Sequence, residues 1–327
     1  MTWRNRMDRR YFLKTIGATV ACSAGGVLAQ KPDRPIRIVV PLTAGSSNDY
    51  VTRVVSPYLT TSLGQTVIVD NKAGANGAIG TMDVVRSAPD GNTLLIASVS
   101  PLAVNMALVA NLPYDSRRDL TPIAGCSLVC NVLLVKSTFP ATTFAEFIAY
   151  AKKHPGQVTL GVSTTTTQVQ MQTIAKMAEI DLLLVPYKGA PAAITDVLGG
   201  TLSATLADPG IALAQTKGGQ MRALAVSTLK RNPVTPDWPA MSETVPGIDF
   251  SIWTMLAGPA GMSRDVVNKY SAAMADALRQ KDVVDKFAQS GTTPLIMGPD
   301  EVKALLANEI TRWVKFVKDS GIKPETI

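Results

Sequence analysis

The chain has 327 residues, with a single histidine, three cysteines, 17% charged residues and a formal net charge of +7. A chain of this length is expected to form about two domains. It can bury enough surface to fold without disulfide bonds or structural metal ions. The lone His154 argues against Ser-His-Asp and Cys-His hydrolysis, and it leaves multi-histidine zinc sites without ligands. The only suitably flanked uncharged apolar stretch lies at the N-terminus and is too short to span comfortably, which excludes a polytopic membrane protein.

Residues 1–29 have the pattern of an export signal. Five basic side chains and one acid fall in 1–14, and the uncharged run TIGATVACSAGGVLA follows at 15–29. DRRYFLK at 8–14 resembles the twin-arginine export motif, with an ordinary signal as the alternative. We expect export to the periplasm and cleavage near Ala29; a lipoprotein would use Cys22, but TVAC lacks the usual leucine.

The mature chain is nearly balanced in charge. Losing residues 1–29 removes five positive charges and one negative charge, so the net charge falls from +7 to +3. The remaining basic residues are scattered and form no stripe of the kind that binds nucleic acid.

From residue 35 onward, β-branched runs alternate with helix-period segments, which is typical of βαβ units and a largely parallel sheet. We expect strands at 36–40, 67–69 and 93–98, and helices at 51–63 and 81–87. Each strand leads into a loop of small polar residues, and these loops should share one edge of the sheet.

A second block begins near residue 131 and keeps the same rhythm. The strand segments are expected within 132–136, 158–163, 182–189, 202–210 and 221–227, and the helical segments within 142–156 and 191–200. A threonine-rich loop is expected before a helix at 169–179. A turn-rich stretch follows, then a strand near 250–259 and helices at 263–280 and 299–319. We therefore predict an export signal at 1–29, lobe I at 31–130 and 251–327, and lobe II at 131–250, with the last helices packing on lobe I.

Two cysteines remain after cleavage, in CSLVC within an apolar run that is expected to be a strand. Residues four apart in a strand lie roughly 13 Å from each other, beyond disulfide reach. Cys126 and Cys130 are therefore expected to be buried free thiols, with a bridge across a local bend as the alternative.

The small-residue loops could bind an anion. GANGAIG at 74–80 has G-x-x-G-x-x-G spacing, which misses the dinucleotide fingerprint, and the chain contains no P-loop. PLTAGSSND at 41–49 enters a helix, where free backbone N–H groups favour a carboxylate; an ordinary capped helix start is the alternative. Asp49 could cap that helix, or order a water or accept from a ligand.

Several segments together carry a family resemblance, in order over about 31–321: PDRPIRIVVPLTAGSSND, VDNKAGANGAIG, APDGNTLLIAS, NLPYDSRRDLTPIA, VPYKGAPAAITDVLGG and MRALAVSTLKRNP. They resemble the Bug receptors, the periplasmic substrate-binding components of tripartite tricarboxylate transporters. The resemblance implies an α/β, two-lobed type II periplasmic-binding-protein fold that closes on a small carboxylate in an interlobe cleft. It implies no catalysis, cofactor or metal.

The resemblance also implies site residues. Pro41, Ala44, Gly45 and Asp49 match the family's first loop, which would hold a ligand carboxylate by backbone amides; Asn71, Gly74, Ala75 and Gly77 match the second; and Tyr187, Lys188 and Gly189 match a block in lobe II. The expected ligand-binding residues are Ala44, Gly45, Ser46, Ser47, Asp49, Asn76, Gly77, Ser98, Ser163, Thr165, Thr167, Gln168, Tyr187 and Asp208.

The chain departs from its family where many relatives have a glycine and a histidine. Here the segment 163–170 reads STTTTQVQ, a hydroxyl-rich wall that we expect to change the distal half of the ligand site. Trp253 precedes threonine where glycine is usual, and it could pack at the hinge or wall the ligand.

Three functional classes remain open from the sequence. The first is a monomeric receptor that delivers an organic acid to membrane transporter subunits, the second a sensory receptor of the same fold, and the third an enzyme, for which no nucleophile and base pair is evident. The candidate ligands are di- and tricarboxylates, acidic amino acids and aromatic carboxylates.

Overall fold

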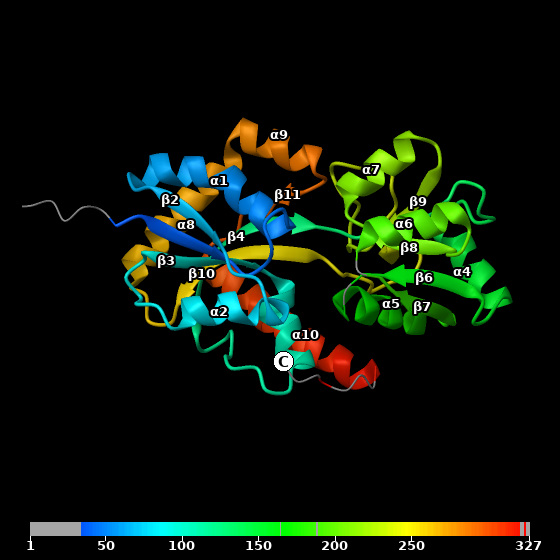
Figure 1. Cartoon of the computed structure of the whole chain (residues 1–327), viewed down its shortest axis with the longest axis horizontal. Coiled ribbons are helices and arrows are strands. Elements are labelled where there is room, and N and C mark those ends of the chain that lie inside the picture. Colours follow the sequence, from blue (N-terminus) through cyan, green and yellow to red (C-terminus); the bar gives the residue numbers. More distant parts are fainter. Residues whose placement is uncertain (1–33, 164, 188, 321–323, 325–327) are drawn as a thin grey trace, which may run out of the picture. The chain divides into compact units, whose positions relative to one another are not determined.

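The computed structural model describes residues 34–163, 165–187, 189–320 and 324. Residues 35–327 form one compact unit that contains two β-sheets (Figure 1). The first sheet has the strand order β11 (Thr293–Pro294), β4 (Leu120–Val129), β10 (Ile252–Pro259), β3 (Thr93–Ser98), β1 (Ile36–Val40) and β2 (Val67–Asn71). The second has the order β7 (Leu182–Pro186), β6 (Val158–Val162), β8 (Ala204–Ala207), β5 (Val132–Lys136) and β9 (Met221–Val226).

Both sheets are mixed, which corrects the expectation of a largely parallel sheet. β1 pairs in parallel with β2 and β3, and β6 with β7 and β8. β10 runs antiparallel to β3 and β4, and β5 runs antiparallel to β8 and β9. The reason is the path of the chain: β4 leads into the second sheet through β5, and β10 brings the chain back, so these strands reverse direction beside the parallel ones.

The helices pack on both faces of these sheets. In chain order they are α1 (Ser47–Leu63), α2 (Ala78–Val85), α3 (Asn105–Leu108), α4 (Phe144–Lys153), α5 (Thr165–Ala178), α6 (Ala190–Gly199), α7 (Pro209–Lys217), α8 (Arg264–Arg279), α9 (Lys281–Gln289) and α10 (Pro299–Ser320). Three short turns add η1 (Ala75–Gly77), η2 (Ser100–Val104) and η3 (Met241–Glu243). In Figure 1, α1 and α9 lie on one face of the first sheet and α2 and α10 on the other.

Local chemistry sets where these helices begin and end. α1 starts at Ser46, whose hydroxyl accepts from the Asp49 N–H, and it stops at Gly64 in the left-handed conformation. α4 starts in the same way at Thr143, and it ends at His154, whose ring stacks on Tyr150 and whose Nδ1 lies 2.9 Å from the Tyr150 carbonyl. The single histidine therefore closes a helix.

The core joins the two sheets. One cluster of buried apolar side chains fills the space between the first sheet, α1 and α8, and it includes Ile38, Val55 and Leu94. A larger cluster contains residues of both sheets and of α10, among them Leu133 of β5, Trp253 of β10 and Trp313 of α10. Trp253 is 1% exposed, so it packs in this core rather than walling a ligand.

Most expected elements form, and the differences are local. The threonines after β6 do not form the expected loop, since helix α5 already begins at Thr165. Packing of Val169 and Ile174 in the core favours the helix. α9 and β11 were not expected and lie between α8 and α10. α10 packs on β4 of the first sheet, and its far end also contacts α5 beside the second sheet.

The state of the two cysteines and the presence of membrane-spanning helices or metal ligands can be read from the described residues. Cys126 and Cys130 are both buried and free, which confirms the expected thiols. Within the described ranges, no helix is long and apolar enough to cross a bilayer, and no group of histidine, cysteine or acidic side chains could hold a metal ion.

Candidate ligand-binding site

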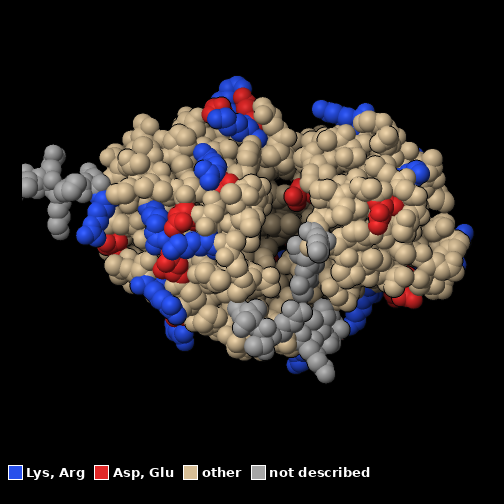
Figure 2. All heavy atoms as spheres, viewed as in Figure 1, with Lys and Arg blue, Asp and Glu red and all other residues tan. Residues whose placement is uncertain are grey.

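A cavity of about 330 Å³ lies where loops and helix starts of the two sheets meet. The molecular surface is hollowed between the two halves of the molecule in the view of Figure 2. The lining residues are Leu42, Asn76, Ser98, Val99, Ser100, Val104, Asn105, Leu108, Val109, Asn131, Ser163, Thr166, Thr167, Asp208 and Ile252. A concave site between two halves of a fold, built at strand ends, is where small ligands usually bind.

The part of the cavity wall next to the first sheet contains hydroxyl and amide groups beside apolar residues such as Val104 and Leu108. Ser98 ends β3, and Ser100 begins the helical turn η2. Asn76 has a left-handed φ of 50°, and the Nδ2 of Asn105 donates to its carbonyl at 3.0 Å. This bond joins two neighbouring loops, so Asn76 and Asn105 are held in the cavity wall together.

Where the chain passes between the sheets, Asn131 makes a dense set of bonds. Its N–H donates to the Ser227 hydroxyl at 3.0 Å, and its carbonyl accepts from the Ser227 N–H at 2.9 Å. Its side-chain Nδ2 donates to Oε1 of Gln170 at 2.7 Å, which ties this segment to α5. Asn131 thus connects both crossover segments to a helix of the second sheet at the edge of the cavity.

The part of the wall next to the second sheet holds Ser163, Thr166, Thr167 and Asp208. The Ser163 N–H donates to Oγ1 of Thr167 at 3.2 Å, so the threonines also order the first turn of α5. Asp208 follows β8 and precedes α7, and its side chain is exposed to the cavity. Burial raises the pKa of Asp208 above its ordinary value.

The loop at 41–49 is built around Asp49, which is 4% exposed. Its carboxylate accepts the Gly45 N–H at 2.9 Å and the Nε of Arg53 at 3.0 Å. Burial alone would raise the pKa of Asp49, but hydrogen bonds from Arg53, Gly45 and Asn71 outweigh it and lower the pKa. Asp49 therefore holds the loop closed on itself, and the amide of Gly45 is engaged by it.

The residues expected to bind a ligand fall into two groups. Asn76, Ser98, Ser163, Thr167 and Asp208 line the cavity together. The others lie outside its lining: Ala44, Gly45, Ser46, Ser47, Asp49, Gly77, Gln168 and Tyr187. Of these, Tyr187 donates to the carboxylate of Asp196 on α6, and Gly77 packs against Pro101. Lys188 and the side chain of Thr165 lie outside the described residues.

Several lining residues were not expected, notably Ser100, Asn105 and Asn131, whereas Thr166 belongs to the segment 163–170 that was expected to form a hydroxyl-rich wall. Ser100 and Asn105 follow β3 in a helical stretch that reads as ordinary core helix, and Asn131 looks like a linker residue. Position could have indicated Ser100, which lies two residues after Ser98 at the end of β3, whereas Asn105 and Asn131 have no such signal.

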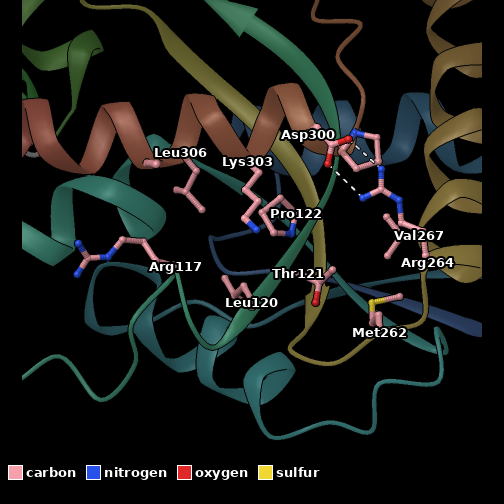
Figure 3. A pocket seen from close by; sticks show the side chains of 12 residues that line it. Arg117, Leu120, Thr121, Pro122, Met262, Arg264, Val267, Asp300, Lys303 and Leu306 are labelled. Atoms are coloured by element: carbon pink, nitrogen blue, oxygen red, sulfur yellow. Dashed lines mark hydrogen bonds and ion pairs between the residues drawn. The ribbon is translucent and has the colours of Figure 1, made fainter.

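A second cavity, of about 350 Å³, opens elsewhere on the first sheet, between the start of β4, the start of α8 and the start of α10 (Figure 3). An ion pair of 2.8 Å joins Arg264 to Asp300 at its rim, and Lys303 points toward Pro122. Its lining comes from the first sheet and its helices alone, so ligand contacts there would not span both halves.

The fold consists of two mixed β-sheets covered by helices and joined by crossover strands, with a polar cavity between the sheets. This arrangement defines a two-lobed solute-binding protein of the type II periplasmic-binding-protein class. Residues 51–322 match the family described as the tripartite tricarboxylate transporter family receptor, and the chain belongs to that family. This is a family of transport receptors rather than enzymes, which agrees with the expectation of no catalysis.

Individual relatives agree with this assignment. The chain is 35% identical over 318 residues to Protein BugT of Bordetella pertussis, covering 95% of this chain and 96% of the relative. It is similar to an R. palustris protein solved with adipate, at 29% identity and a TM-score of 0.78, over 90% of this chain and 100% of that one. It is also similar to MatC from Rhodopseudomonas palustris with bound malate, at 27% identity and a TM-score of 0.72, over 88% and 99%.

Proposed function

We propose that this chain captures a small organic carboxylate in the cavity between the two sheets and delivers it to the membrane subunits of a tripartite tricarboxylate-type transporter. The observation that carries the proposal is a cavity lined by hydroxyl and amide groups from both sheets. Similar proteins have been solved with adipate and malate, two small carboxylates. The receptor would work as a monomer in the periplasm, after removal of residues 1–29 by a twin-arginine-type export route.

A carboxylate can be held in such a cavity by dipoles alone. Ser98, Ser100, Asn76 and Asn105 present hydroxyl and amide groups on the wall next to the first sheet, and hydrogen bonds to a charged group are worth about 1.5–3 kcal/mol each. Backbone amides of the loops after β1 and β2 would complete this anchor. The bond from Gly45 to Asp49 keeps the first of these loops in the required shape.

Binding and closure would be one event in this arrangement. Lobe I (31–130 and 251–327) and lobe II (131–250) each contribute lining residues, so a ligand that touches both favours the closed state through contacts that the open state lacks. The closed state would then present one surface to the membrane subunits. Co-purification with a transporter subunit, rather than with a sensor kinase, would identify the partner.

The proposal is tested by a thermal-shift screen of residues 30–327 against di- and tricarboxylates, amino acids and aromatic acids, followed by calorimetry on the compounds that shift. A ligand at 100 times its Kd adds about 2.7 kcal/mol to the stability of the folded state. We expect at least one organic acid to bind with one-to-one stoichiometry. Binding of no carboxylate, or equal shifts with matched neutral amides, would contradict the proposal.

A glycine pair tests the loop at 41–49 separately. Gly45 and Gly219 both have positive φ, of 81° and 67°, and a Cβ at either position would meet nothing within 4 Å. Gly45→Ala and Gly219→Ala should therefore lose similar stability, about 1–2 kcal/mol. We expect Gly45→Ala to weaken carboxylate binding about tenfold by calorimetry, and Gly219→Ala to bind as the wild type does; equal affinities would remove the loop from the anchor.

A further inference from the structure

Asp208 stands at a position where aspartate usually caps a helix. It is the residue before α7, with φ −65° and ψ 150°, and aspartates there commonly accept from the first backbone N–H groups of their helix. The Asp208 side chain makes no such capping bond. Instead it lines the cavity and is exposed to it, so its carboxylate is available to a ligand rather than to its own helix.

Asp208 has no counterion among the described residues that line this cavity. Among the described residues of the lining, none is lysine, arginine or histidine, and Asp208 is the single charged one. Its neighbours in the wall of the second sheet are the uncharged Ser163, Thr166 and Thr167, with Asn131 at the crossover. Taking this carboxylate out of water without a cation is costly, and the raised pKa of Asp208 has the direction that desolvation gives. A ligand that brings a positive charge would remove this cost.

The opposite wall has the complementary chemistry. On the side of the first sheet, the described polar residues of the lining carry hydroxyl and amide groups and no acid: Asn76, Ser98, Ser100 and Asn105. An anionic group is therefore accepted on that side, whereas a second carboxylate directed at Asp208 would meet like charge. Between the two ends, Val104, Leu108 and Ile252 provide apolar surface for a short carbon chain.

We propose that the ligand of this receptor carries a protonated amine in addition to its carboxylate, and that Asp208 accepts from that amine. The inference rests on the proposed function and narrows its ligand class from organic acids to amino acids and related zwitterions. Asp208 is then the residue that selects amine-bearing acids against plain dicarboxylates.

Ligand pairs that differ in one group test this by calorimetry. Glutamate and glutarate differ by an amine, as do aspartate and succinate, and 5-aminopentanoate has an ammonium in place of one carboxylate of adipate. We expect the better amine-bearing ligand to bind the wild type at least tenfold tighter than its partner, as one hydrogen bond between charged groups provides. Asp208→Asn should lose that preference. Asp237→Asn is the control, because it removes the same charge from an exposed position outside the cavity lining.

The pH dependence of the wild type gives a second readout that needs no variant. An amine-bearing ligand requires ionised Asp208, so its affinity should rise as pH increases through the raised pKa of that carboxyl. If instead protonated Asp208 donates to a second carboxylate, dicarboxylates bind more tightly as pH falls. That outcome, or a ligand preference that Asp208→Asn leaves unchanged, overturns the inference while leaving carboxylate capture intact. Binding of no carboxylate at any pH would instead remove the proposed function.

Discussion

Asp49 shows how a single side chain can shape a loop. It is almost fully buried, it accepts the amide of Gly45, and its ion pair with Arg53 spans one helical turn. From the sequence alone, the role of Asp49 stays open between capping helix α1 and contacting a ligand. The geometry shows that it organises the loop between β1 and α1, a task that needs a short acid one turn into the helix.

The ionised form of Asp49 should therefore contribute to stability. Its folded-state pKa is lowered, so the contribution is fully present above the unfolded-state value near 4 and is lost as pH falls through the folded-state value. We expect Asp49→Asn to cost about 1–3 kcal/mol of unfolding free energy at pH 7, measured by urea denaturation. The difference from wild type should shrink below about pH 4. A cost that is independent of pH would show that the charge of Asp49 is not the cause.

Site residues were predictable from the sequence where a strand end and a family motif coincide. Ser98 ends a strand, Ser163 and Asp208 each lie just after one, and all three line the cavity. Asn105 and Asn131 were not predictable in this way. Asn105 reaches the cavity through a turn of π-helix after β3, and Asn131 through the crossing of two strands, and neither irregularity has a clear sequence signature.

At the scale of single elements, β4 depends on one close approach. Gly125 donates its N–H to the Met297 carbonyl at 3.1 Å, and a Cβ there would lie 2.4 Å from the Leu295 carbonyl oxygen. Because a backbone oxygen cannot move aside as a side chain does, Gly125→Ala should cost about 2–3 kcal/mol by urea denaturation. Gly199→Ala is the matched control, since it ends α6 with open space around it and should be neutral or slightly stabilising. Equal effects would contradict this account of β4.

Helix α10 is clamped to the crossover segment by Arg312. Its guanidinium donates to the Asp249 carbonyl at 2.7 Å and to Glu309 at 2.9 Å, and it lies 5.9 Å from the ring centre of Phe250. Burial raises the pKa of Glu309, partly offset by the charge of Arg312. Without Arg312, the Glu309 carboxylate would be left uncompensated.

We therefore expect Arg312→Ala to cost about 2–4 kcal/mol at pH 7, and the double variant with Glu309→Gln to cost less than the single one. The sign follows from the raised pKa of Glu309: an acid of this kind favours the folded state when protonated, so the stability of Arg312→Ala should fall as pH rises through that pKa. Urea denaturation between pH 4 and 8 measures both effects. A double variant less stable than Arg312→Ala would show that the loss comes from packing alone.

Elements with strong local patterns were the predictable ones. The runs at 36–40, 93–98 and 132–136 form strands with those bounds, because each is a short apolar stretch ended by a turn or a polar residue. β11 has two residues and forms by pairing with β4, so no local pattern could indicate it. The threonines of α5 have weak helix propensity, and tertiary packing of Val169 and Ile174 overrides it.

At the scale of the whole molecule, the two free thiols lie at places that can be used to follow different motions: the crossover between the sheets for Cys130 and the interior of the first sheet for Cys126. Cys126 lies inside β4, whereas Cys130 follows the end of β4 on the crossover between the sheets, where Asn232 donates to its sulfur at 3.4 Å. Burial raises the pKa of the Cys130 thiol to about 11 and that of Cys126 further, so both should react slowly in the folded state. In the proposed closure of the lobes, the segment that carries Cys130 bends and the interior of β4 stays unchanged.

Alkylation followed by mass spectrometry should therefore modify Cys130 before Cys126 under native conditions at pH 8, with no reductant needed. A saturating ligand should change the rate at Cys130 at least severalfold, because the ligand fixes the crossover in one state, while the rate at Cys126 follows global unfolding alone. Denatured protein supplies the control, in which both thiols react at the same rate. If the two cysteines react together in the native protein, labelling proceeds through global opening, and the crossover does not move independently of the sheets that it joins.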